Sequence, residues 1–261
     1  MLNKLLKKDL KKDMRWMWIL FVATILTAFV GRGCKELGQN ILFFKILRIF
    51  FDSVYYSLAV NVILQPFLRN FTNFSKSLYG DESYLTHTLP VTKNQIINSK
   101  FITAIVEMVL GFITLVVSLL VLFYSNSFAT TLKLLLSALI VGKFSLLLVL
   151  TLFIILVIVE FLMFISLIFF SIVIAYRAKE KRVLKTFLLT TALAFASMFV
   201  LAIVMICVLA INGIKLSANT LILSNTAFIS VILAGIIVYS VIIILMYFLT
   251  KKEFNKGVNV D

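Results

Sequence analysis

The sequence predicts an all-α integral membrane protein with six transmembrane helices, and three observations lead to this fold class. Of the 261 residues, 62% are hydrophobic and only 14% are charged, whereas soluble domains carry about 25% charged residues. The mean hydropathy is +1.11. Apolar segments of about 20 residues, the length that crosses a bilayer as a helix, recur along the chain between short basic stretches.

The first fifteen residues, 1–15, are expected to form an amphipathic helix that lies in the membrane surface. Their leucines fall near one helical face and their lysines on the other. The apolar run that follows resembles the core of a signal peptide, but Arg32 stands where a cleavage site requires a small neutral residue. We therefore expect residues 14–31 to remain as an uncleaved first span.

Five further segments have the length and composition of membrane spans. Together with the first, the expected spans cover residues 14–31, 49–68, 101–124, 146–175, 187–211 and 226–249. Residues 128–143 are apolar but too short to cross, and they contain Lys133 and Lys143, so we expect them to lie at the outer interface. With no internal repeat and no soluble insertion, residues 1–261 are expected to form a single transmembrane domain.

The distribution of basic residues predicts that both termini are cytoplasmic, because cytoplasmic loops carry the excess of Lys and Arg. With the N-terminus inside, most of the 25 Lys and Arg residues fall in inner segments. The outer side keeps only Arg32, Lys35, Lys45, Arg48, Lys133, Lys143 and Lys215. The net charge of +14 is thus explained by membrane orientation, and we expect no nucleic acid partner because no basic soluble surface is formed.

The second span carries polar residues at four-residue intervals. They are Ser53, Ser57, Asn61, Gln65 and Arg69. Since four residues turn a helix by about 400°, these side chains form one slowly drifting stripe, which should face protein or water rather than lipid. Two interpretations remain open: hydrogen bonds between helices, and the lining of a translocation pathway by Ser57, Asn61 and Gln65.

Three acidic residues fall within expected spans, where ionisable groups are costly and are functional candidates. Glu160 lies near the middle of the fourth span with no Lys or Arg at matching depth, and both a packing role and a role in the substrate pathway remain open. Glu107 lies about two turns after Lys100, and we expect it to snorkel toward the inner interface. Asp52 follows Arg48 by four residues, which predicts a local ion pair.

The sequence lacks the motifs of nucleotide binding, catalysis and metal binding. No GxxxxGK[ST], HExxH or GxSxG stretch occurs. One histidine excludes the paired-His zinc motifs, and Cys34 and Cys207 are too few for a cysteine metal site or a disulfide scaffold. We therefore expect a protein that is not an enzyme and has no metal site. If it were an energy-driven transporter, its ATPase would be on a separate subunit.

The segment between the second and third spans, residues 76–92, is polar and contains clear helix start and stop signals. In "YGDESYLTHTLPVTKNQ", Gly80 is expected to end one helix, and Pro90 to stop a short second helix. Asp81 and Glu82 place negative charge where that short helix would begin. The spacing of Thr92 and Gln95 matches a capping box that starts the third span.

The short helix would present Tyr84, Leu85 and Leu89 as apolar contacts on the cytoplasmic side. An exposed helix with bulky apolar side chains is typical of a docking surface.

This segment and the basic stretch "MLNKLLKKDLKKDMRW" resemble the permease subunits of bacterial type-2 ABC exporters. In that family a GDE-G/S-YL stretch, a T-L-P-V element and a lysine that opens the third span recur after the second span. The matching residues are Gly80, Asp81, Glu82, Tyr84, Leu85, Thr88, Leu89, Pro90, Val91 and Lys100. His87 stands where the family more often has an apolar or aromatic residue, and we interpret it as a surface residue of the short helix.

The resemblance implies a permease in the bacterial cytoplasmic membrane, surrounded by lipid and paired with an identical or related permease subunit. Two separate ATPase subunits would bind ATP and Mg²⁺, and this chain would bind no cofactor. Residues 80–90 would be the coupling helix, with Gly80, Asp81, Glu82, Tyr84, Leu85, His87, Leu89 and Pro90 at the ATPase contact. By analogy with members of this size, the cargo is expected to be a hydrophobic or amphipathic peptide of the bacteriocin or cytolytic class.

Two other classes of function are compatible with the residues. One is a membrane immunity or sensor protein that binds a peptide in the bilayer and transports nothing. The other is an intramembrane enzyme, for which no catalytic spacing is present.

Overall fold

The computed structural model describes residues 2–38, 41–80, 83, 91–123, 130, 134, 146–176, 181–212 and 225–256. All regular structure in these ranges is helical, and six of the helices are long and apolar enough to cross a membrane. The predicted all-α fold with six helices long and apolar enough to cross a membrane is therefore confirmed.

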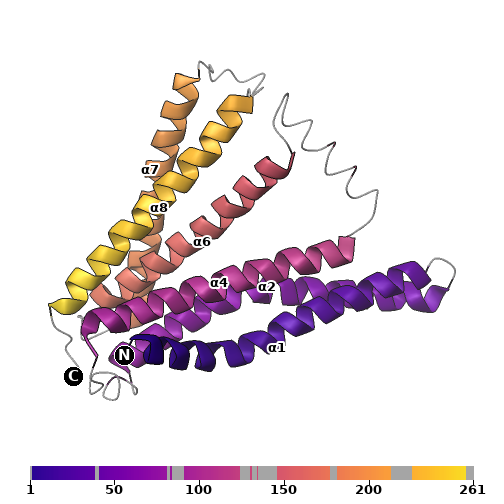
Figure 1. The fold of residues 1–261 in the computed structure, drawn as a ribbon, viewed down its shortest axis with the longest axis horizontal. Helices are drawn as coiled ribbons and strands as arrows, with labels where there is room; N and C mark the ends of the chain where they lie inside the picture. The colour runs from indigo at the N-terminus through magenta and orange to yellow at the C-terminus, as the bar shows by residue number, and fades with distance from the viewer. Residues whose placement is uncertain are drawn as a thin grey trace. The chain divides into compact units, whose positions relative to one another are not determined.

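The six long helices each contain one of the predicted spans or nearly all of it (Figure 1). They are α1 (Leu2–Leu37), α2 (Leu42–Tyr79), α4 (Lys93–Phe123), α6 (Leu146–Ala175), α7 (Arg182–Ile211) and α8 (Asn225–Asn255). Residues 2–15 run without a break into the first span as part of α1, so they are not a separate helix. Whether this end of α1 lies in the membrane surface stays a prediction. At 36 and 38 residues, α1 and α2 exceed the roughly 20 residues that cross the hydrocarbon.

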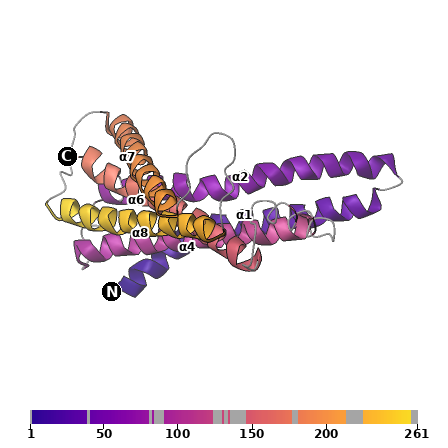
Figure 2. The ribbon, with the colours of Figure 1, turned by 90° about the horizontal axis from the view of Figure 1, so that it is seen from above.

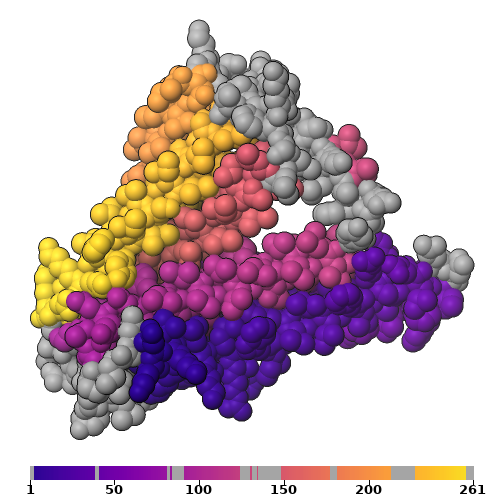
Figure 3. Space-filling model, viewed as in Figure 1, coloured from indigo at the N-terminus to yellow at the C-terminus, as the bar shows by residue number. Residues whose placement is uncertain are grey.

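The chain divides into two compact helical units, residues 1–128 and 129–261. In the first unit, α1 packs against both α2 and α4, and α2 packs against α4. Figures 2 and 3 show α1 lying along these neighbours. The core of this unit contains two apolar clusters, one around Met17, Phe21 and Val62 and one around Tyr55 and Leu122.

The second unit contains α6, α7 and α8, all three in mutual contact. Its core gathers around Met163 and Leu167 of α6 and Tyr239 of α8, with leucine, isoleucine, phenylalanine and methionine side chains packed against them. A Cβ on Gly235 would lie 2.9 Å from a methyl carbon of Leu156, so the missing side chain lets α8 approach α6 closely.

Helix α2 and helix α4 approach each other closely where proline interrupts the hydrogen bonds of α2. Pro66 has no N–H and therefore cannot donate to the carbonyl of Val62. A Cβ on Gly111 of α4 would lie 3.3 Å from that carbonyl oxygen. Glycine at this position lets the backbone of α4 approach the carbonyl that proline leaves without its helical partner.

The start and stop signals around the polar segment are confirmed at both ends. Helix α2 ends at Tyr79, and the Gly80 N–H donates to the Lys76 carbonyl at 3.1 Å. Before α4, the Thr92 N–H donates to Gln95 Oε1 at 3.2 Å, and the Gln95 N–H donates to Thr92 Oγ1 at 3.4 Å. This reciprocal pair is the predicted capping box.

Candidate functional site

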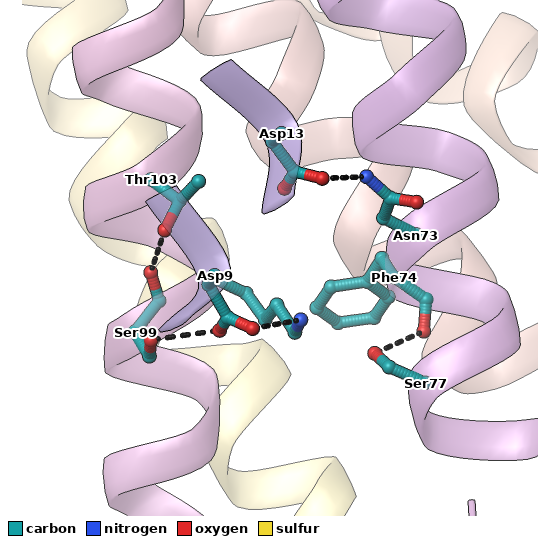
Figure 4. A network of polar contacts seen from close by, with 8 residues as sticks. Asp9, Asp13, Asn73, Phe74, Ser77, Ser99 and Thr103 are labelled. Atoms are coloured by element: carbon teal, nitrogen blue, oxygen red, sulfur yellow. Dashed lines mark hydrogen bonds and ion pairs between the residues drawn. The ribbon is translucent and has the colours of Figure 1, made fainter. Parts of the chain in front are cut away.

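Polar side chains that are buried or half-buried gather where α1 begins, α2 ends and α4 begins. We call this group the polar clamp, and it consists of Asp9, Asp13, Arg69, Asn73, Ser99 and Lys100. Figure 4 shows Asp9 pointing from α1 toward Ser99 of α4, and Asp13 pointing toward Asn73 of α2. Two consecutive turns of one helix therefore bind two different neighbours.

Asp9 joins α1 to α4 through both of its carboxylate oxygens. Lys100 Nζ lies 3.1 Å from Asp9 Oδ1, and Ser99 Oγ donates to Asp9 Oδ2 at 2.9 Å. The two charged side chains are only 12% and 10% exposed, so little water screens the attraction between them. The Thr103 hydroxyl donates to the Ser99 carbonyl at 2.9 Å and extends this network along α4.

Asp13 joins α1 to α2. Asn73 Nδ2 donates to Asp13 Oδ1, and Arg69 Nη1 donates to the backbone carbonyl of Asp13 at 3.2 Å. Both donors lie on one face of α2 because they are four residues apart. Arg69 is the last residue of the polar stripe that the sequence predicts along this helix, and Asn73 extends that stripe by one turn.

The helical repeat explains why α1 buries its acids and not its lysines. Asp9 and Asp13 are one turn apart and share a face with Met17. All three are buried, whereas Lys8 and Lys12 are exposed. The buried face of α1 is thus acidic in the first turns of the helix and mostly apolar from Met17 onward.

Glu107 lies deeper in the first unit, and its expected snorkelling is wrong. The residue is 0% exposed. Asn70 Nδ2 donates to Glu107 Oε2 at 2.9 Å and to the Pro66 carbonyl at 2.8 Å. Among the described residues, Glu107 Oε1 has no hydrogen-bond partner. Glu107 faces α2 because Asn70 offers a donor there, so the carboxyl does not reach toward the interface.

The three predicted pathway residues of α2 are not part of the buried core of the first unit. Ser57 is exposed, while Asn61 and Gln65 are half-buried. Asn61 Nδ2 donates to the Ser57 carbonyl of its own helix at 2.9 Å. The described contacts of Ser57 and Asn61 thus stay within α2, and a pathway role for this part of the stripe stays a prediction.

Glu160 belongs to the second unit, in α6, and is half-buried. Within the described part of the chain its carboxylate makes no hydrogen bond or ion pair, although it lies within electrostatic range of Tyr239 on α8. The choice between a packing role and a pathway role stays open. The expected pair of Arg48 and Asp52 is confirmed, with Nε and Oδ2 3.4 Å apart.

Of the predicted coupling residues, only Gly80 is described. The others, Asp81, Glu82, Tyr84, Leu85, His87, Leu89 and Pro90, lie outside the described residues. Most of the predicted outer segment 128–143 lies outside them too. Ser83 is described, is buried, and donates from its N–H to the Gly80 carbonyl at 2.9 Å.

The ion pair and hydrogen bonds of the polar clamp join α1 to α2 and to α4. Within the described ranges, no three His, Cys, Asp or Glu side chains gather as metal ligands, and Cys34 and Cys207 are both free. The sequence prediction missed Asp9, Asp13, Asn70, Asn73 and Ser99. The available signal was an acidic pair four residues apart on the apolar face of a lysine-rich helix.

Comparison with known proteins found no match among family models, curated proteins or solved structures.

Proposed function

We propose that this chain is the membrane-spanning permease subunit of an ATP-driven exporter of hydrophobic or amphipathic peptides. Residues 80–90 contact a separate ATPase subunit, which binds ATP and Mg²⁺. A second permease subunit, identical or related, completes the pathway. Both termini and the coupling segment lie in the cytoplasm, and the membrane is the bacterial cytoplasmic membrane.

One observation carries the proposal. The polar clamp binds α1 to the helix that leads into the coupling segment and to the helix that leaves it. Asn73 lies about two turns before Gly80, and Ser99 lies about two turns after Lys93. A force on the segment between α2 and α4 would therefore be transmitted to α1, α2 and α4 together.

The test is a substitution in the coupling segment, made in full-length protein reconstituted with its partner ATPase. Leu85→Asp places a charge in an apolar contact, and we expect peptide transport to be lost while ATP hydrolysis no longer responds to peptide. Leu85→Met keeps an apolar side chain of similar volume and serves as the matched control. Transport and peptide-stimulated hydrolysis in proteoliposomes are the readouts.

Wild-type coupling in the Leu85→Asp protein would contradict the coupling role. Failure of the chain to co-purify with any ATPase would instead favour the immunity or sensor protein, which needs no energy source.

A further inference from the structure

A groove of about 320 Å³ runs along the first unit between α1 and α2. Because the two helices are antiparallel, each end of the groove has one wall from each helix. Trp16 and Arg69 line one end, and Ala23 and Leu58 line the other. The distance from Trp16 to Ala23 along α1 is about 10 Å.

The end at Arg69 is polar. Gln65 lies one turn from Arg69 on the same face of α2 and also lines the groove. Among the described residues, the guanidinium makes one hydrogen bond, to the Asp13 carbonyl at 3.2 Å. A guanidinium has five N–H donors, so Arg69 keeps donors that suit the paired oxygens of a phosphate.

The rest of the groove is apolar. Met17, Ile19, Leu20, Ala23 and Leu58 form its walls. A shallow apolar depression on α1 adjoins the groove, shares Ile19 and Ala23 with it and continues along the helix to Leu26. The apolar surface thus extends away from Arg69 and has room for more than a short side chain.

The depth of the groove in a membrane follows from its tryptophan. Trp16 is 63% exposed, and tryptophan prefers the headgroup level of a bilayer. Arg69 lies beside it, so the cation sits at headgroup level and the apolar walls extend toward the hydrocarbon. With the N-terminus inside, this level is the cytoplasmic leaflet, which carries anionic lipid.

We propose that the groove between α1 and α2 binds one anionic phospholipid, with its phosphate at Arg69 and Gln65 and an acyl chain along Ile19, Ala23 and Leu58. The charge at one end and the apolar walls beyond it match the two parts of such a lipid. Since Arg69 also belongs to the polar clamp, the bound lipid adds to the contact between α1 and α2. The inference rests on the proposed orientation with the N-terminus inside and does not depend on the proposed transport activity.

The two tryptophans of the chain supply the probe, because Trp18→Phe leaves Trp16 as the only indole. The full-length variant is reconstituted in phosphatidylcholine vesicles with a minor fraction of phosphatidylglycerol. Brominated acyl chains, which quench tryptophan at contact, are placed either on the phosphatidylglycerol or on an equal fraction of the phosphatidylcholine. We expect brominated phosphatidylglycerol to quench Trp16 more strongly than the same fraction of brominated phosphatidylcholine. The difference should correspond to an enrichment of the anionic lipid at the groove of about three- to fivefold.

Two substitutions in the Trp18→Phe background test the two parts of the site. Arg69→Gln should remove the excess quenching, whereas Lys76→Gln, which removes an exposed lysine of the same helix outside the groove, should retain it. Ala23→Phe fills the apolar part without touching Arg69 and should lower the excess even if Arg69→Gln disturbs folding. Equal quenching by the two labels, or an excess that survives both Arg69→Gln and Ala23→Phe, would overturn the proposal.

Discussion

The two helical units bury different kinds of contact. The first unit joins its helices with buried or part-buried polar bonds, among them Asp9 to Lys100, Asp13 to Asn73 and Asn70 to Glu107. In the second unit, Asn212 at the C-terminal end of α7 donates to Ser230 of α8 at 3.1 Å. The mean hydropathy of an 18-residue apolar stretch in each helix follows the same division. It is 1.7, 1.4 and 2.7 in α1, α2 and α4, and 3.1, 2.9 and 2.9 in α6, α7 and α8.

This difference indicates how each unit holds its helices in place. A buried hydrogen bond or ion pair is satisfied at one register only, since a shift of one residue leaves its partners unpaired. Apolar side chains against apolar side chains tolerate small shifts and repack. We therefore expect the first unit to act as a rigid body and the second to adjust more easily, and four sets of variants test this contrast.

The largest effect is expected from Lys100→Met, which removes the charge beside the buried Asp9 carboxylate. Loss of one partner of a buried ion pair costs about 3 kcal/mol. The free energy of unfolding in detergent micelles measures this loss. Lys93→Met, which removes an exposed lysine of the same helix, should change it by less than about 0.5 kcal/mol. Equal effects of the two variants would mean that the clamp does not hold α1 to α4.

A smaller effect is expected from Gly111→Ala, since the new methyl group meets the Val62 carbonyl oxygen at 3.3 Å. Backbone yields little, so overpacking of about 1 to 3 kcal/mol outweighs the gain in helix propensity of about 1 kcal/mol, which either Gly→Ala change brings. Gly235→Ala in the second unit meets the movable ends of Leu156 and Met205, so there the same gain offsets the strain. A greater loss from Gly235→Ala than from Gly111→Ala would reverse the contrast between the units.

A still smaller effect is expected from substitutions of Glu107. Gln keeps an acceptor oxygen for Asn70, so Glu107→Gln should lower the unfolding free energy by less than about 1 kcal/mol. Glu107→Leu removes the acceptor, and the expected loss is about 1 kcal/mol or slightly more. Thermal unfolding of the two proteins in the same detergent compares them. If Leu were tolerated better than Gln, the bond to Asn70 would contribute nothing to stability.

The smallest effect is expected from Glu160→Gln in the second unit. The carboxylate makes no hydrogen bond or ion pair among the described residues, and we expect the unfolding free energy to change by less than about 0.5 kcal/mol. Transport activity is the second readout. Unchanged activity would exclude a role that depends on the charge of Glu160, and lost activity in a stable protein would favour the pathway role.

Local signals allowed much of the fold to be predicted. Gly80 ends α2, and the capping box of Thr92 and Gln95 starts α4, because each signal acts within a few residues of its own position. The spans were predictable for a similar reason, since a run of apolar residues identifies a membrane helix without reference to its neighbours.

The candidate site was less predictable because its partners are far apart in the sequence. Asp9 and Lys100 are 91 residues apart, and Asp13 and Asn73 are 60 residues apart. No local sequence pattern indicates which acidic residue will bind which donor. The prediction for Glu107 was wrong for the same reason. Its sequence position about two turns after Lys100 suggested that its side chain reaches the inner interface, whereas the fold places it beside Asn70 of α2.

The separation of Asp9 from Lys100 also has a consequence for the order of biosynthesis. Ribosomes add about 5 to 20 residues per second, so Asp9 waits for roughly 5 to 20 seconds before its lysine has been made. Until Asn73 and then Lys100 have been made, Asp13 and Asp9 lack these partners. Their charged side chains are then favoured in the water at the membrane surface. The first helix would therefore reach its final position only after α4 has entered the bilayer, which makes its docking a late event of assembly although it is the first to be synthesised.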